Sequence, residues 1–298
     1  MSDFINSAKE IFAELPHLLL HSFKDTIHIL PFLFISYLVM EFIEHKASGK
    51  LATAIRRSGK AGPFIGSAVG IIPQCGFSTL ASSFYAGKII TMGTIVAVFL
   101  STSDEMLPVM ISNKFPVASI LIILFTKFII AVIAGFIIDL IFRPSLHNDE
   151  EIEEFCNHEH CQCEKGIFRS SLYHTVHVFI FILIVTIVLN IFIHFVGEDK
   201  LASLVIGKPV LGQLIAGIIG LIPNCASSVI ITELYIKGAI SAGAMMSGLL
   251  VGAGVGLLVL FRTNKHLKEN LIIAGLMYSI GVIFGILLDL INFGAILK

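Results

Sequence analysis

A short polar motif occurs twice in this chain, and it constrains the fold more than any other feature. Pro73-Gln74-Cys75, followed by Ser78, returns as Pro223-Asn224-Cys225, followed by Ser228. Subtracting 73 from 223 gives an offset of 150 residues, and the cysteines and serines keep it. Proline has no backbone N–H and ends or kinks a helix at the preceding residue. The pattern therefore predicts two similar halves, each interrupted at its proline.

The composition places both halves in a membrane. Charged residues make up 14% of the 298 residues and hydrophobic residues 56%, with a mean hydropathy of +0.92. A soluble domain carries about 25% charged residues. The net charge of −1 gives no indication of a nucleic-acid partner. We expect an all-α, polytopic protein in contact with lipid, and a homodimer remains open.

The apolar runs divide the chain into matching parts. Residues 1–142 form the first transmembrane repeat, including an amphipathic helix at 3–23, and residues 171–298 form the second. Residues 143–170 form an acidic loop rich in His and Cys. The expected apolar segments are 26–43, 61–87, 88–112 and 117–142, then 176–195, 209–237, 239–261 and 271–290. The proline breaks fall within 61–87 and 209–237.

Each proline-broken segment is either one broken helix or a re-entrant hairpin. An arm of about 12 residues gives roughly 18 Å of helix, which reaches only the middle of the bilayer. Broken helices that cross would give parallel halves, whereas hairpins would give inverted halves. With the basic loop at 44–60 in the cytoplasm, the distribution of Lys and Arg narrowly favours inverted repeats. Such repeats, with broken segments near the midplane, are typical of secondary transporters.

The breaks carry a thiol, an amide and a hydroxyl beside freed backbone carbonyls. Thiolates favour soft metals and trivalent arsenic, and amide and carbonyl oxygens favour harder ions. Buried free cysteines otherwise often serve only in packing. The candidate binding residues at the breaks are Gln74, Cys75, Ser78, Asn224, Cys225 and Ser228.

Acidic residues interrupt the apolar segment 88–112. Ser103, Asp104 and Glu105 are candidates for ion binding because charges inside a bilayer are expensive and mark ion pathways. The second repeat has glycines here, so a cation site could combine the acids with carbonyls of the run 252–256. The alternatives are a helix cap for Asp104 and close packing for the glycines.

Three further acidic residues are less informative. Glu233 is a candidate ion ligand, or it pairs with Lys237 four residues later. Asp139 and Asp289 lie at the ends of spans, where we expect them to be interfacial.

The central loop is a candidate metal-capturing or sensing segment. Short tracts rich in Cys and His bind metals, although this one lacks the spacing of a structural zinc site. The alternative is a solvated acidic linker. The candidate ligands in this loop are Cys156, His158, His160, Cys161 and Cys163.

No catalytic residues or resident cofactor are predicted. Neither proline-broken segment has a histidine that could activate its cysteine. A membrane thiol enzyme and a metal sensor are therefore weaker alternatives to a transporter.

The duplicated halves, the two Pro-x-Cys breaks and the His- and Cys-bearing loop resemble the ten-helix heavy-metal exporters. These are distant relatives of the organoarsenical efflux permeases, and the resemblance covers essentially the whole chain. It implies efflux of a metal or metalloid ion, taken as arsenicals or manganese, across the bacterial cytoplasmic membrane. One cysteine per break departs from a three-thiol arsenite site, whereas Asp104 and Glu105 suit a divalent cation.

The sequence thus favours a secondary transporter that exports a divalent heavy-metal cation, manganese-like or another transition metal. Protons would be exchanged through Asp104, Glu105 or Glu233. The alternative is an arsenical or arsenite permease that uses Cys75 and Cys225.

Overall fold

The structure is a computed structural model of the chain. It describes residues 61–72, 75–103, 106–142 and 210–297, and scattered helical residues within 27–38 and 168–188. The side chains of Cys75 and Cys225 are not part of this description, and the central loop and most of the spans expected at 26–43 and 176–195 lie outside it.

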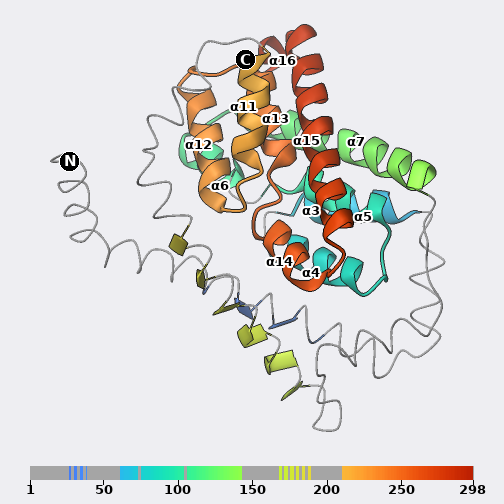
Figure 1. Ribbon diagram of the computed structural model, residues 1–298. Helices are drawn as coiled ribbons and strands as arrows, with labels where there is room; N and C mark the ends of the chain where they lie inside the picture. The colour runs from blue at the N-terminus through green and yellow to red at the C-terminus, as the bar shows by residue number, and fades with distance from the viewer. Residues whose placement is uncertain are drawn as a thin grey trace, which may run out of the picture.

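Every regular element in these ranges is an α-helix, which confirms the all-α prediction there (Figure 1). The helices before the central loop are α3 (Gly62–Gly70), α4 (Cys75–Ala86), α5 (Met92–Ser101), α6 (Met106–Ser112) and α7 (Val117–Phe142). Those after it are α11 (Leu211–Gly220), α12 (Cys225–Ile236), α13 (Ala242–Val251), α14 (Val255–Thr263), α15 (Leu267–Leu290) and α16 (Phe293–Ile296).

Four stretches of the described chain are long and apolar enough to cross a membrane: Met92–Ser112, Val117–Phe142, Ala242–Thr263 and Leu267–Leu290. The first and third are 75% and 83% buried, whereas α7 and α15 are 39% and 33% buried. The α5–α6 and α13–α14 stretches therefore form the core. On α7 and α15, large apolar side chains remain exposed, as a lipid-facing surface requires: Leu121, Phe125, Leu140, Leu271, Leu287 and Leu290.

The helices are interrupted at both prolines, as predicted. Helix α3 ends at Gly70 and α4 begins at Cys75, and α11 ends at Gly220 and α12 begins at Cys225. Helices α11 and α12 stand side by side in Figure 1, joined by residues 221–224, as a hairpin would be.

Two more interruptions lie in the core. The break between α5 and α6 falls where Ser103 and its acidic neighbours were expected to interrupt the segment. The glycine-rich segment expected at 239–261 is also interrupted, because α13 ends at Val251 and α14 begins at Val255. Gly254 has a φ of 53°, a left-handed conformation that glycine adopts without steric cost.

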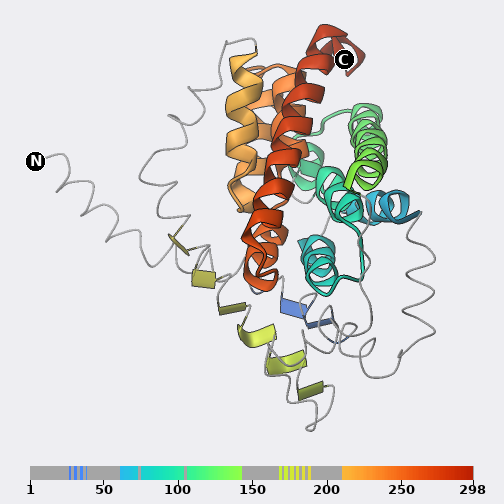
Figure 2. The ribbon, with the colours of Figure 1, turned by 45° about the vertical axis from the view of Figure 1, so that its right-hand side comes forward.

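The two core stretches run in opposite directions. Lys88, before α5, forms an ion pair with Glu269, after α14, and Phe115, after α6, packs on Tyr235, before α13. The start of each stretch therefore lies beside the end of the other. Helix α4 packs on α14, and α12 contacts α6, so each half covers a helix of the other. Figures 1 and 2 both show α4 beside α14.

Candidate ion-binding site

Ser78 places the first proline break against the glycine run of the second half. Its side chain is fully buried on α4, and a Cβ added at Gly256 would lie 2.6 Å from the Cβ of Ser78. One turn later, the hydroxyl of Ser82 donates to the carbonyl of Gly256 over 2.7 Å. The backbones of α4 and α14 approach this closely because residue 256 has no side chain.

Asn224 organises the second proline break. Its side chain is buried and caps α12, where Oδ1 accepts from the N–H of Ala226 over 3.3 Å. The hydroxyl of Ser227 donates to the carbonyl of Asn224 over 2.8 Å. The hydroxyl of Ser228 would lie 3.3 Å from a Cβ added at Gly252. The predicted residues Ser78 and Ser228 thus flank opposite ends of the glycine run 252–256.

The end of α5 contributes a row of buried hydroxyl groups. The hydroxyls of Ser101, Thr102 and Ser103 each donate to a backbone carbonyl, at 2.8 to 3.1 Å. A hydroxyl that donates in this way keeps lone pairs that can accept or ligate. A role of Ser103 in ion binding stays a prediction, and Gln74, Asp104 and Glu105 lie outside the described residues.

Lys127 is a site residue that the sequence analysis missed. It lies on α7 and is fully buried, and its ammonium donates to the carbonyl of Thr102 and, over 2.9 Å, to the carbonyl of Leu249. It thereby joins the break after α5 to the end of α13. The expectation of an uninterrupted apolar span over 117–142 overlooked it, although one lysine ten residues into such a span is itself a signal of function.

Glu233 forms an ion pair with Lys237 over 3.0 Å, which confirms the alternative interpretation of this residue. Both side chains are substantially exposed at the end of α12. A further role of Glu233 in ion binding stays a prediction.

Asp139 and Asp289 cap the neighbouring core helices. Asp139 accepts from the hydroxyl of Thr91 over 2.7 Å and from the N–H of Gly93 over 2.8 Å, at the start of α5. Asp289 accepts from Ser241, Gly243 and Gln213 at 2.5 to 2.7 Å, at the start of α13. A carboxylate is stabilised at a helix N-terminus. These span-end residues therefore serve to hold helices together.

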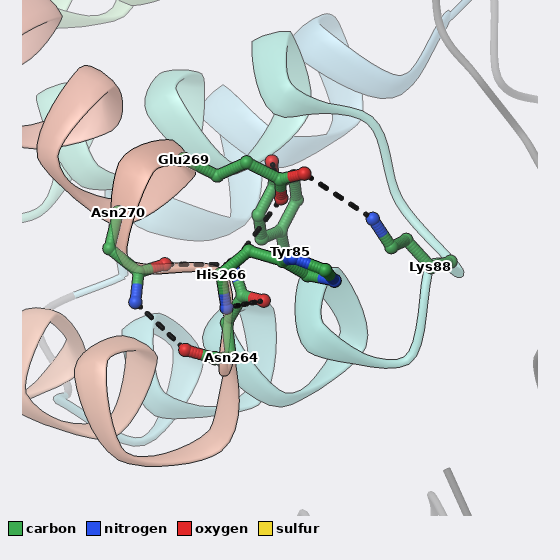
Figure 3. Close-up of polar contacts among 6 residues, drawn as sticks. All are labelled: Tyr85, Lys88, Asn264, His266, Glu269 and Asn270. Atoms are coloured by element: carbon green, nitrogen blue, oxygen red, sulfur yellow. Dashed lines mark hydrogen bonds and ion pairs between the residues drawn. The ribbon is translucent and has the colours of Figure 1, made fainter. Parts of the chain in front are cut away.

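A polar cluster joins the two halves at the outer end of α4 (Figure 3). Glu269 accepts a hydrogen bond from Tyr85 over 3.1 Å and pairs with Lys88 over 3.6 Å. Asn264 and Asn270 donate to each other's oxygens at 2.7 and 2.9 Å, which fixes the turn between α14 and α15. Because Tyr85 and Lys88 belong to the first half, this cluster ties the first half to the second.

No three His, Cys, Asp or Glu side chains gather at a metal-binding distance within the described part of the chain. Cys75 and Cys225 occupy the first positions of α4 and α12. The five candidate ligands of the central loop lie outside the described residues, as do the acids after Ser103.

Comparison with known proteins identifies the family. A family described as "Putative, 10TM heavy-metal exporter" matches residues 14–196 and 170–298, which together extend over 14–298. No curated protein and no solved structure matches the chain. With its apolar helices and interrupted core, the chain belongs to this family of multi-pass membrane exporters of heavy metals.

Proposed function

We propose that the chain exports a divalent heavy-metal cation, manganese or a similar transition metal, through the region around the glycine run 252–256. One structural observation supports this proposal in addition to the family match. Ser78 and Ser228, from the two proline breaks, flank the same glycine run at Gly256 and Gly252. Interrupted helices whose freed carbonyls face each other inside a bilayer form ion sites in other transporters.

The ligands proposed for this cation are mostly oxygens. Ser78, Ser103 and Ser228 supply hydroxyls, and Gln74 and Asn224 supply amides. Asp104 and Glu105, which follow Ser103 in the sequence, supply the negative charge. A divalent transition metal suits such a mixed set, which Cys75 and Cys225 would complete with softer ligands.

The transport cycle we propose uses inverted repeats. Matched positions differ by 150, since 241 − 91, 243 − 93 and 289 − 139 all give that number, and the matched aspartates make matching contacts. The core stretches that these contacts anchor run in opposite directions. Halves related in this way can exchange conformations and open the site to either side of the membrane in turn.

Proton exchange would drive export. The acidic residues Asp104, Glu105 and Glu233 are the proposed carriers, because a carboxylate that releases a metal ion can take up a proton. We further propose that the bacterial cytoplasmic membrane is the site of action, with Cys156, His158, His160, Cys161 and Cys163 collecting metal on its cytoplasmic side.

An arsenical permease is the second candidate. The observation that favours it is that Cys75 and Cys225 begin α4 and α12, the two helices that follow the proline breaks. Thiols at matched positions would bind trivalent arsenic, which prefers sulfur ligands.

Flux in proteoliposomes tests the proposal. Protein-containing and protein-free liposomes would be loaded separately with Mn, Zn, Co, Cd, arsenite and methylarsenite, with and without a pH gradient. We expect protein-dependent, gradient-stimulated flux of a divalent metal. Flux confined to the arsenicals would support the second candidate, and no flux of any substrate would refute both.

Labelling of Cys161 with an impermeant thiol reagent tests the inverted arrangement independently. We expect labelling in everted vesicles and not in intact cells. Labelling from outside intact cells would refute inverted halves with a cytoplasmic loop.

A further inference from the structure

We infer that the C-terminal ends of α5 and α13 form an internal site for a monovalent cation, which the ammonium of Lys127 fills as a tethered ion. This inference goes beyond the proposed export function. It assigns a binding site to a buried charge that export of a divalent metal does not require.

The site is built from helix ends. Thr102 caps the C-terminus of α5, and Leu249 is among the last residues of α13. The last four carbonyls of a helix have no partner within the helix and carry its partial negative charge. The carbonyls of Thr102 and Leu249 both accept from Lys127. Because α5 and α13 run in opposite directions, their negative ends converge on this ammonium.

The position of Lys127 agrees with a site inside the membrane. It lies ten residues after Val117, the first residue of α7, which corresponds to about 15 Å of helix or half of a bilayer core. The residue is 0% exposed. A buried charge this deep is tolerated only where specific partners replace water.

The second half provides a natural comparison. Subtracting 150 from 277 gives 127, so Met277 of α15 is the counterpart of Lys127. Met277 is also fully buried. The matched position thus accommodates an unbranched side chain of similar length without an ammonium group. Lys127→Met therefore removes the charge while keeping most of the volume.

If the site binds cations, a free ion should be able to take the place of the Lys127 ammonium once that group is removed. A purely structural role of Lys127 predicts no such binding. Potassium is close to an ammonium group in size and prefers oxygen ligands such as carbonyls. In Lys127→Met the carbonyls of Thr102 and Leu249 remain, and we expect K⁺ to bind between them. Any ligand that binds only the folded state raises the melting temperature.

The test measures the melting temperature of the purified full-length protein in KCl and in choline chloride at equal ionic strength, because choline is too large for the site. We expect the wild type to show the same Tm in both salts. Lys127→Met should melt lower than the wild type in choline and gain about 3–6 °C in KCl. Met277→Leu, a change at the matched buried position, should show no preference between the salts.

Lys127→Gln provides a second variant if Lys127→Met does not accumulate, because its amide still donates to carbonyls while the charge is gone. A smaller gain in KCl is expected. Equal melting temperatures in the two salts for both variants would overturn the inference, as would the same KCl gain in Met277→Leu. Since no metal flux is measured, this result is independent of the proposed export function.

Discussion

The hydroxyl of Tyr85, at the end of α4, donates a hydrogen bond to the carboxylate of Glu269, at the start of α15, over 3.1 Å. The two residues belong to different halves of the chain, and Lys88 pairs with the same carboxylate. The contact fixes the outer end of α4 to the turn between α14 and α15, while the tip of α4 lies at the glycine run. One helix therefore links the surface of the protein to the candidate site.

Tyr85→Phe should destabilise the protein by about 1 kcal/mol, because it removes one partly buried hydrogen bond to a charged group and leaves the ring in place. Thermal unfolding in detergent measures this effect. Tyr235→Phe is the matched control, since Tyr235 packs its ring on Phe115 and the substitution keeps that contact. An equal loss in both variants would show that the bond to Glu269 contributes nothing specific.

Asp289→Asn should destabilise the protein more than Asp139→Asn. Asp289 accepts from Ser241, Gly243 and Gln213, whereas Asp139 accepts from Thr91 and Gly93 among the described contacts. Hydrogen bonds to charged groups contribute about 1.5–3 kcal/mol each, and loss of the charge also removes the interaction with the helix N-terminus. The midpoints of thermal unfolding would rank the two variants. The reverse ranking would contradict the assignment of these residues as caps.

Gly93→Ala should prevent stable folding. A Cβ at residue 93 would lie 2.1 Å from the carbonyl oxygen of Gly135, which is backbone and cannot turn away. Overpacking of a core costs about 1–3 kcal/mol even where side chains can adjust, so this clash should cost more. Gly275→Ala, on α15, is the control because a Cβ there meets nothing within 4 Å. We expect Gly275→Ala to accumulate normally and Gly93→Ala to be lost from the membrane fraction; equal amounts would refute the close packing of α5 on α7.

Local signals in the sequence predicted many of the helix boundaries. The span expected at 117–142 is the whole of α7. The helices also break at the two prolines, because a proline disrupts the helix at its own position in the sequence. The glycine run 252–256 left two interpretations open, exposed backbone carbonyls or close helix packing. The structure shows a break there, where α13 ends at Val251 and Gly254 has a positive φ.

Tertiary contacts account for the rest of what was missed. The sequence around Lys127 does not predict its hydrogen-bond partners, because one of them, Leu249, is 122 residues away. The cap that Asp139 provides for α5 depends likewise on the packing of α7 against that helix. Ser78 and Ser228 were predicted as site residues, but only the fold shows that they flank the same glycine run.

Variants at the helix breaks should show whether the substrate is a divalent cation or an arsenical. A charge at mid-membrane costs at least about 2.5–3.5 kcal/mol, so Asp104 requires a functional reason to be present. For a divalent cation, Asp104→Asn should abolish flux, because it removes one of the two carboxylates proposed to neutralise the ion. Cys75→Ser combined with Cys225→Ser should only weaken flux or change the preferred metal.

For an arsenical the order reverses, because bonds between arsenic and thiolate would carry the binding and a carboxylate would contribute little. Flux of Mn and of methylarsenite in proteoliposomes, measured for Asp104→Asn and for the double serine variant, decides between the two. Ser101→Ala is the control for disturbance of the break itself, because Ser101 is not a proposed ligand and its hydroxyl donates to the carbonyls of Ala97 and Val98. An inactive double serine variant beside a normal Asp104→Asn would refute export of a divalent cation and support the arsenical permease.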